Sequence, residues 1–187
     1  MNALVAYESR LEMTVLLQLD FNKFVHSVVS QPFTLHYLQN GKSYYHTPDF
    51  FVRSTDGNGE IINVKPHKFI GRENNVRAFH ACESVSHQMG LAYSTRSELN
   101  PVLLANLFWL SGYRRIVASV DDLAPKLIDA ALNPIPICQI INFVNGVPSI
   151  IRPVLFHLLW KGVLTTDLYN RMTDQTLIWT PQIAPQL

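Results

Sequence analysis

Hydrophobic and polar positions near the start of the chain recur at helical spacing, which predicts a helix over residues 8–21. Arg10, Thr14 and Gln18 form one polar stripe of this helix. Glu12 falls nearly opposite that stripe, among apolar residues. A carboxylate that faces a core is either paired with a cation or lies at the rim of a site, so Glu12 is a candidate site residue.

Two apolar runs joined by DGNG predict a β-hairpin, because Gly and Asn supply the positive φ angles of tight turns. Alternate side chains share one face, namely Asp49, Phe51 and Arg53 on the first strand and Ile61, Asn63 and Lys65 on the second. A loop centred near Gly57 places Asp49 opposite Lys65. It also places Phe51 opposite Asn63. The acid, amide and ammonium on this face are costly in a core without a partner, a metal or a substrate.

The segments around this hairpin predict an α/β domain. Residues 24–38 predict β structure interrupted at Gln31-Pro32, and an NGK turn leads into a short strand at 43–46. After the hairpin we expect a helix over 71–89, a strand over 91–95 and a helix from Asn100 to about Trp109. This order is typical of a restriction-endonuclease-like α/β domain, to which we assign residues 1–113.

Residues 114–187 predict a small, mostly helical, winged-helix-like domain. Asn-Pro, Asn-Gly and Pro breaks separate three short helices, and two small strands around a polar turn follow them; the helices are 121–133, 136–145 and 148–161. The third helix carries few donors for base edges or phosphates. This favours the docking of a protein partner over the reading of DNA.

Composition indicates a folded chain without a strongly basic surface. The 187 residues are 48% hydrophobic and 16% charged, with a net charge of +1. Both halves are close to neutral, so charge alone does not provide a strong grip on nucleic acid, which fits a protein that partners deliver to DNA. The three tryptophans are expected in the core: Trp109, Trp160 and Trp179.

Cysteine and histidine positions indicate neither a disulfide framework nor a zinc site. Cys82 and Cys138 form no CxxC pair, and the histidines show no HxH or HxxxH spacing. The N-terminus has no signal-peptide pattern, and Arg152 and His157 interrupt the most apolar C-terminal run. We therefore expect a cytoplasmic protein with no membrane-spanning segment.

Five ordered pieces of the sequence carry a resemblance: SRLE at 9–12, QPF at 31–33, TPDFFV at 47–52, NVKP at 63–66 and SELNPVLLANLFWL at 97–110. Together they resemble the TnsA endonucleases of heteromeric cut-and-paste transposons, prokaryotic members of the PD-(D/E)xK nucleases. The resemblance implies that the first domain cuts the 5′ ends of the transposon, while a partner transposase, TnsB, cuts and joins the 3′ ends. It also implies that the second domain contacts TnsC, an ATPase regulator.

By motif position, the resemblance assigns catalytic roles to Glu12, Asp49 and Lys65. The two carboxylates would bind Mg²⁺, or Mn²⁺ in its place, together with the side-chain oxygen of Asn63 and the carbonyl of Val64. Lys65 would orient or deprotonate the attacking water, or stabilise the leaving charge. Asn63 stands where the family often has Gln or Glu, so the site has two carboxylates instead of three.

Other interpretations stay open at this point. The chain is alternatively a stand-alone restriction or repair nuclease, although its near-neutral charge and apolar third helix argue against this. It is alternatively a non-catalytic adaptor that links transposase and ATPase, which Asn63 alone favours. Taken singly, Asp49 is also typical of a turn cap and Lys65 of an edge-strand charge. The predicted catalytic helix begins close to residue 1, so we expect a compact variant or a trimmed start.

Overall fold

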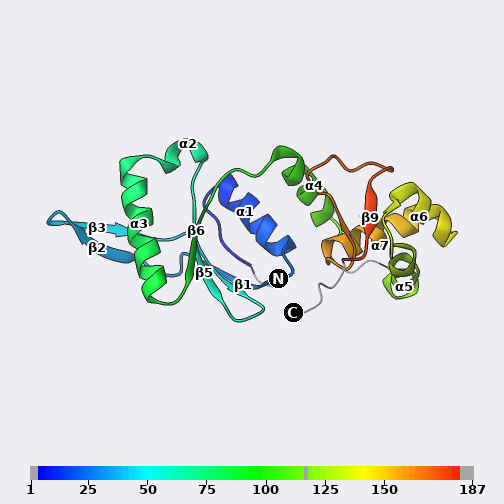
Figure 1. Ribbon diagram of the computed structural model, residues 1–187, viewed down its shortest axis with the longest axis horizontal. Helices are drawn as coiled ribbons and strands as arrows, with labels where there is room; N and C mark the ends of the chain where they lie inside the picture. Colours follow the sequence, from blue (N-terminus) through cyan, green and yellow to red (C-terminus); the bar gives the residue numbers. More distant parts are fainter. Residues whose placement is uncertain (1–3, 116–117, 182–187) are drawn as a thin grey trace. The chain divides into compact units, whose positions relative to one another are not determined.

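The structure is a computed structural model that describes residues 4–115 and 118–181. Its chain forms two compact units, Met1–Leu99 and Asn100–Leu187, which we call unit 1 and unit 2 (Figure 1). Unit 1 is a mixed α/β structure with a central mixed sheet, and unit 2 is helical with a small sheet. The predicted fold class, a mixed α/β part followed by a mostly helical part, is therefore confirmed at this coarse level.

Unit 1 is a four-stranded sheet between helices. The strand order is β1-β4-β5-β6, antiparallel except that β6 runs parallel to β5. Helix α1 covers one face of the sheet and α3 covers the other (Figure 1). The bounds are α1 Arg10–Phe21, β1 Val25–Ser30, β2 Leu35–Gln39, β3 Lys42–His46, β4 Phe50–Ser54, β5 Gly59–Val64, α2 His67–Ile70, α3 Glu73–Gln88 and β6 Ala92–Arg96.

The face of the sheet under α1 forms a hydrophobic core. Val15 and Leu19 of α1 lie at helical spacing and pack against alternate residues of three strands, namely Val28, Phe50, Val52, Ile62 and Val64. Burial of these side chains stabilises unit 1, at about 25 cal/mol per Å² of apolar surface. Because side chains alternate along β5, Asn63 is directed to the opposite face, toward α3.

The register of the β4–β5 hairpin differs from the predicted one by two residues. Phe51 pairs with Ile61, not with Asn63 as predicted. The reason is a turn centred one residue earlier than expected, closed by a hydrogen bond of 2.9 Å from Ser54 N–H to the carbonyl of Asn58. Because the shift is even, every side chain keeps its predicted face of the sheet.

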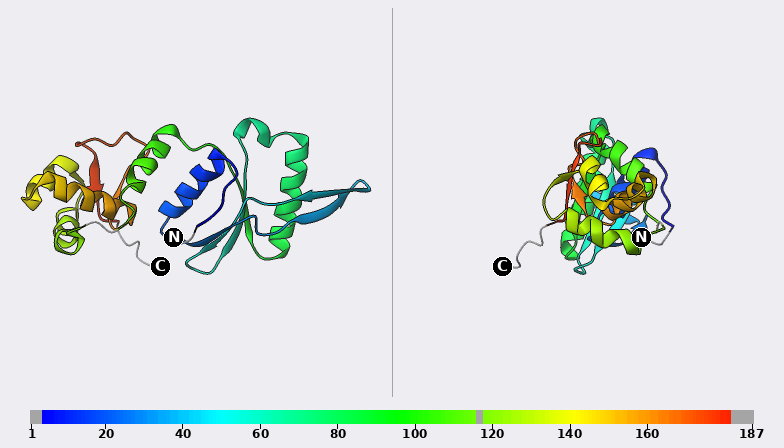
Figure 2. Two further views of the ribbon diagram at one scale, coloured as in Figure 1. Left: turned by 180° about the vertical axis from the view of Figure 1, so that it is seen from behind. Right: turned by 90° about the vertical axis from the view of Figure 1, so that its right-hand side faces the viewer.

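Strands β2 and β3 form a separate two-stranded sheet, which we call the ribbon. Its turn places Asn40 and Gly41 at φ values of 52° and 73°, the pair of positive angles that a two-residue hairpin turn requires. Figure 1 and the left-hand view of Figure 2 show the ribbon projecting past α3. The predicted NGK turn is confirmed.

Unit 2 is built around α7, which packs against α4, α5 and α6. Seven consecutive residues of this helix, 154–160, are buried. A three-stranded sheet of order β7-β9-β8 completes the unit. The bounds are α4 Pro101–Ser111, α5 Val120–Ala130, β7 Ile135–Pro136, α6 Ile137–Val144, α7 Pro148–Trp160, β8 Thr165–Thr166 and β9 Leu177–Trp179.

Helix α4 groups with unit 2, whereas the sequence placed it in a first domain of residues 1–113. Asn106 explains the grouping, because its amide Nδ2 donates to the carbonyls of Leu168 and Asn170 at 2.9 and 2.8 Å. Helix α4 also packs against α7. Among the described helices, none is long and apolar enough to cross a membrane.

Candidate active site

Asp49 precedes β4, and its carboxylate is partly buried. Its Oδ2 accepts a hydrogen bond from Val64 N–H at 2.6 Å, and its Oδ1 has no partner among the described residues. Burial raises the pKa of Asp49, and the Glu12 carboxylate raises it further. The Val64 N–H, the Lys65 ammonium and His46 oppose this rise. Burial and a second acid thus both disfavour the charge of Asp49, and a bound cation would relieve both costs.

Asn63 is fully buried, and both ends of its amide are paired. His46 Nε2–H donates to Asn63 Oδ1 at 2.8 Å, and Asn63 Nδ2 donates to the Tyr93 hydroxyl at 2.9 Å. That hydroxyl also lies 3.2 Å from Thr95 Oγ1. Burial raises the pKa of the Cys82 thiol to about 11, against the effect of its hydrogen bond with Asn63. Groups from β3, β6 and α3 therefore fix one orientation of the amide.

These partners of Asn63 were not selected from the sequence. Tyr93 and Thr95 lie two residues apart on β6, so period-two alternation was a signal that they share a face. The parallel pairing of Asn63 with Thr95 depends on a crossover through α3, which local pattern does not reveal. With the observed hairpin register, the position across from Asp49 is that of Asn63, and not that of Lys65 as predicted.

Glu12 lies in the first turn of α1 and completes a capping box. Glu12 N–H donates to Ser9 Oγ at 3.1 Å, and Ser9 O–H donates back to Glu12 Oε1 at 2.7 Å. Glu8 N–H donates to Glu12 Oε2 at 2.8 Å. The S-x-x-E pattern is a signature of this cap, so the SRLE piece has a structural role as well as the predicted one. In this conformation both carboxylate oxygens serve the helix, while the charge of Glu12 still acts on Asp49.

Lys65 directly follows β5, and its backbone N–H donates to the carbonyl of Arg96 at 3.0 Å. This bond ties the end of β5 to β6. The Lys65 ammonium forms no ion pair within the part of the chain that the structure describes. Its positive charge favours the ionised form of Asp49 and so lowers the pKa of that acid. The partly buried Asp49 and the Lys65 ammonium thus lie at the same end of β5, and the charge of Lys65 acts on Asp49.

Residues 22–98 match a family model described as TnsA-like endonuclease N terminal. This segment is a TnsA-like endonuclease domain. The match confirms the resemblance and indicates a nuclease associated with transposition. No curated protein matches the chain. The matched residues include Asp49, Asn63, Val64 and Lys65, whereas Glu12 lies before them.

The donor atoms of the candidate site suit a hard divalent cation. Over residues 4–115 and 118–181, no three His, Cys, Asp or Glu side chains cluster as a metal site. The two candidate carboxylate ligands supply oxygens, namely Asp49 Oδ1 and the carboxylate of Glu12, whose charge raises the pKa of Asp49. Asn63 Oδ1 already accepts from His46, although an amide oxygen has a second lone pair. These residues fit Mg²⁺ if Glu12 releases its cap.

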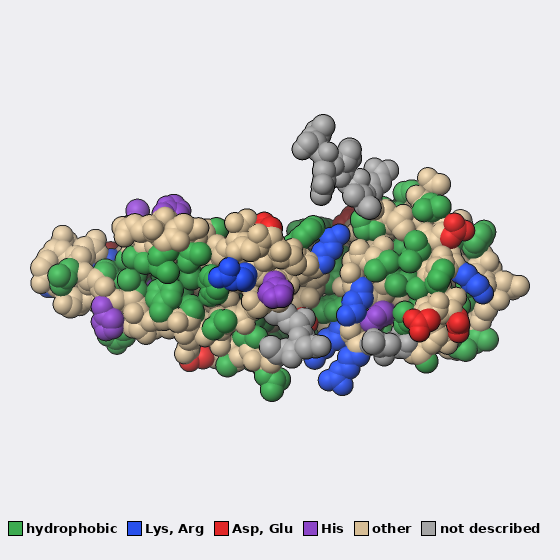
Figure 3. Space-filling model, turned by 90° about the horizontal axis from the view of Figure 1, so that it is seen from below, with side chains coloured by type: hydrophobic (Ala, Val, Ile, Leu, Met, Phe, Trp, Pro, Cys, Tyr) green, Lys and Arg blue, Asp and Glu red, His purple; other side chains and the backbone are tan. Residues whose placement is uncertain are grey.

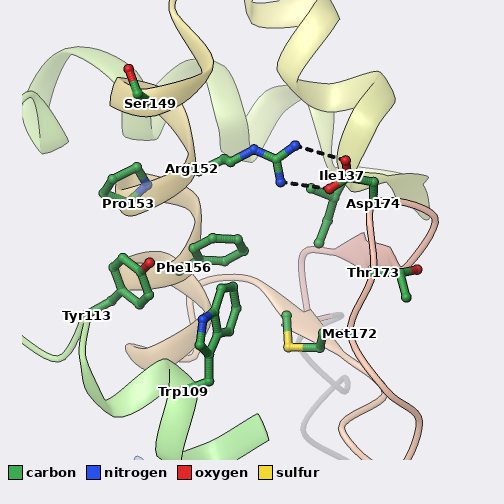
Figure 4. A pocket seen from close by; sticks show the side chains of 10 residues that line it. All are labelled: Trp109, Tyr113, Ile137, Ser149, Arg152, Pro153, Phe156, Met172, Thr173 and Asp174. Carbon is green, nitrogen blue, oxygen red and sulfur yellow. Dashed lines mark hydrogen bonds and ion pairs between the residues drawn. The ribbon is translucent and has the colours of Figure 1, made fainter.

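Unit 2 contains a hollow of about 390 Å³, and three of its ten lining residues are aromatic (Figure 4). The rings of Trp109 and Phe156 meet edge to face with centroids 4.2 Å apart, and Tyr113 lies 5.1 Å from Phe156. Arg152 forms a two-pronged ion pair with Asp174 at 2.7 and 3.0 Å. Trp109 was expected in the core, but it is 45% exposed because its ring lines this hollow. The two charged side chains of the lining are therefore paired with each other.

Proposed function

We propose that this chain is a Mg²⁺-dependent DNA endonuclease that cuts the 5′ ends of a transposon in a heteromeric cut-and-paste system. The observation that carries this proposal is the partly buried Asp49 carboxylate beside the free ammonium of Lys65, within a TnsA-like endonuclease domain. The order of helices and strands in unit 1 supports a restriction-endonuclease-like classification of this domain.

The residues of the site suit phosphodiester hydrolysis. A divalent ion held by Asp49, Glu12, the Asn63 amide oxygen and the Val64 carbonyl would offset charge on the phosphoryl oxygens and activate water. Lys65 would orient or deprotonate the attacking water, or stabilise the leaving oxygen. Asn63 would also hold the end of β5 in place through its buried hydrogen bonds.

Unit 2 is assigned to partner docking. Its short helices and small sheet support a winged-helix-like classification. The third helix of that motif, α7, is mostly buried and presents few donors for DNA. A TnsC-type ATPase and a TnsB-type transposase are therefore its proposed partners.

A second candidate is a non-catalytic adaptor between transposase and ATPase. Two observations favour it. Both carboxylate oxygens of Glu12 accept hydrogen bonds in its helix cap, and the described residues contain no cluster of three metal-binding side chains. The third alternative, a stand-alone nuclease, has only the fold in its favour, because the net charge of +1 provides little grip on bare DNA.

The decisive experiment is cleavage of transposon-end DNA by the full chain together with its transposase and ATPase. Asp49→Ala should lower 5′-end cleavage at least about 10³-fold, while 3′ cleavage and complex assembly continue. Asp56→Ala, on the exposed turn of the same hairpin, is the matched control. Uncut 5′ ends with the wild-type chain would establish the adaptor. Strong cutting of bare DNA by the chain alone would establish the stand-alone nuclease.

Metal binding can be tested without cleavage. Crystals soaked in Mn²⁺ should show anomalous scattering between Glu12 and Asp49, and Asp49→Ala crystals should not. The hydrogen bonds of Glu12 to Ser9 and to Glu8 should break in the metal-bound form. Absence of the signal both with and without bound DNA would contradict the proposed metal site.

A further inference from the structure

We propose that Gln31 is a positioning residue, which fixes the spacing between Glu12 and Asp49, the two carboxylates that would bind the metal ion. The inference rests on the proposed endonuclease function for the identity of the metal. It gives a role to the QPF piece of the sequence at 31–33. That piece carries part of the TnsA resemblance, yet it contains none of the predicted site residues.

Gln31 directly follows β1 and is tied through its backbone to Asp49. Its N–H donates to the carbonyl of Asp49 at 2.9 Å, one residue beyond the pair of Ser30 with Phe50 in the β1–β4 ladder. The carboxylate of Asp49 is held from β5, because Val64 N–H donates to its Oδ2 at 2.6 Å. The main chain of Gln31 is therefore joined to the strand end that carries the site acid.

The side chain of Gln31 reaches the segment that precedes α1. Its Nε2 donates to Glu8 Oε1 at 2.7 Å, between residues 23 positions apart in the chain. Glu8 in turn donates its backbone N–H to Glu12 Oε2 at 2.8 Å, and the Ser9 hydroxyl donates to the other oxygen. Three hydrogen bonds thus form a continuous link, through Gln31, from the peptide of Asp49 to the carboxylate of Glu12.

The backbone at Gln31 indicates that a side chain is required at this position. Gln31 has a φ of 48°, in the left-handed region that favours glycine. A residue with a Cβ is strained there, and such strain persists where surrounding contacts require it, most often at functional sites. Gln31 is exposed, so its side chain does not fill the core. The hydrogen bond to Glu8 is the contact that explains glutamine in place of glycine.

The link leaves the negative charge of the site available to a cation. Within the described residues, none of the ion pairs involves Glu8, Glu12 or Asp49. Figure 3 shows few acidic side chains over unit 1, toward the left of that view, so three linked acids are a local concentration. The charge of Glu12 raises the pKa of Asp49, so these two carboxylates act on one another. The amide of Gln31 pairs with Glu8 without the positive charge that lysine or arginine would add.

The test is Mn²⁺ binding to the full chain, measured by isothermal titration calorimetry without DNA. Gln31→Gly keeps the positive φ and removes the side chain, so the affinity should fall about tenfold. Gln31→Ala should lose as much affinity and have the lower Tm, because alanine is strained at this φ. The matched control is Asn40→Gly, at another exposed position of unit 1, with a φ of 52°, and it should bind Mn²⁺ like the wild type.

Exchange of the two hydrogen-bonding side chains tests the link itself. In the double variant Gln31→Glu with Glu8→Gln, the amide at position 8 can donate to the carboxylate at position 31, and the net charge is unchanged. The Mn²⁺ affinity should therefore return to within about threefold of the wild type. An affinity as low as that of Gln31→Gly would contradict a role for this hydrogen bond.

Amide hydrogen exchange at Glu8, followed by NMR without metal, separates this inference from the proposed function. The Glu8 N–H should exchange several-fold faster in Gln31→Gly, because its hydrogen bond to Glu12 loses support. If the wild-type chain and Gln31→Gly bind Mn²⁺ equally well, the positioning role is overturned and the metal site stands. If the wild-type chain binds no Mn²⁺, the metal site is overturned. Faster exchange at Glu8 would then still support the link, whereas equal exchange would overturn it.

Discussion

The β4–β5 hairpin and the β2–β3 ribbon both turn through residues with positive φ, at Gly57 in one and at Asn40 and Gly41 in the other. Their surroundings are opposite. Helices α1 and α3 cover both faces of β5, where Ile62 and Asn63 are fully buried. The ribbon is covered on one face, and its outer face is open. Both hairpins form through similar turn residues, and they differ in how far other elements cover their faces.

Burial imposes a complete set of partners on the polar groups of the central hairpin. Asn63 satisfies its amide with His46 and Tyr93, because an unpaired buried amide costs roughly 1–3 kcal/mol. The polar groups of the ribbon tip can instead use water, and so they stay available to a ligand. A buried hairpin is therefore suited to hold reacting groups in a fixed geometry, and an exposed one is suited to bind a surface.

Lys65→Ala should have the largest effect among the changes to the central hairpin. Loss of the free ammonium beside Asp49 should lower 5′-end cleavage by about 10²–10⁴-fold and leave DNA binding nearly unchanged. Lys68→Ala is the control, because Lys68 is a nearby lysine whose Nζ lies over a different group, the Phe69 ring, at 4.8 Å. Single-turnover cleavage and anisotropy on the same preparations measure both effects. Cleavage within tenfold of the wild type would remove Lys65 from the catalytic group.

Local pattern was enough to predict the elements of both hairpins. The helical spacing of Val15 and Leu19 predicted α1, and the Gly- and Asn-rich turns predicted the paired strands. The register failed by two residues because Ser54 bonds to Asn58, a choice of turn that the DGNG sequence leaves open. Such a choice depends on tertiary packing and not on local propensity.

The charged residues of the candidate site were predicted from the sequence, and the buried partners of Asn63 were not. Asp49 and Lys65 were visible because charges on a strand need an explanation. His46 and Tyr93 were invisible because they meet Asn63 only after β3 folds over α3 and β6 pairs with β5. The cap at Glu12 was missed although S-x-x-E is a local signal, since the same four residues also matched the family pattern.

Glu12→Gln and Ser9→Ala should distinguish the proposed catalytic role of Glu12 from its role in the helix cap. Gln removes the charge and keeps one of the two acceptor oxygens, so cleavage should fall about 100-fold with a smaller loss of stability than in Ser9→Ala. Ser9→Ala removes the N-cap and should cost about 1 kcal/mol of stability, with cleavage changed less than about threefold. Cleavage assays and thermal unfolding measure the pair. Full activity in Glu12→Gln would mean that Glu12 acts only in the helix cap and not in catalysis.

Asn63→Ala should show that the buried network supports the central hairpin. It leaves His46 Nε2 without its partner and leaves the Tyr93 hydroxyl with Thr95 alone, so unit 1 should lose roughly 1–3 kcal/mol. Asn40→Gly, in the ribbon turn, keeps the positive φ and should change stability by less than about 0.5 kcal/mol. Urea unfolding compares the two. Equal stability of both variants would mean that the amide network is not needed for folding.

Asp49→Asn should produce a small change in stability, a Tm higher by about 1–3 °C at neutral pH. Burial, with a smaller effect of Glu12, raises the pKa of Asp49 above 3.8, so the folded state holds this proton more tightly than the unfolded chain. The stability gained from that proton is present at low pH and is lost as the pH rises through the raised pKa. Asn still accepts the Val64 N–H bond without the charge. The gain should therefore shrink as the pH falls toward 3.8, and Asp56→Asn should show none. A lower Tm for Asp49→Asn at neutral pH would mean that Lys65 and His46 outweigh burial at this acid.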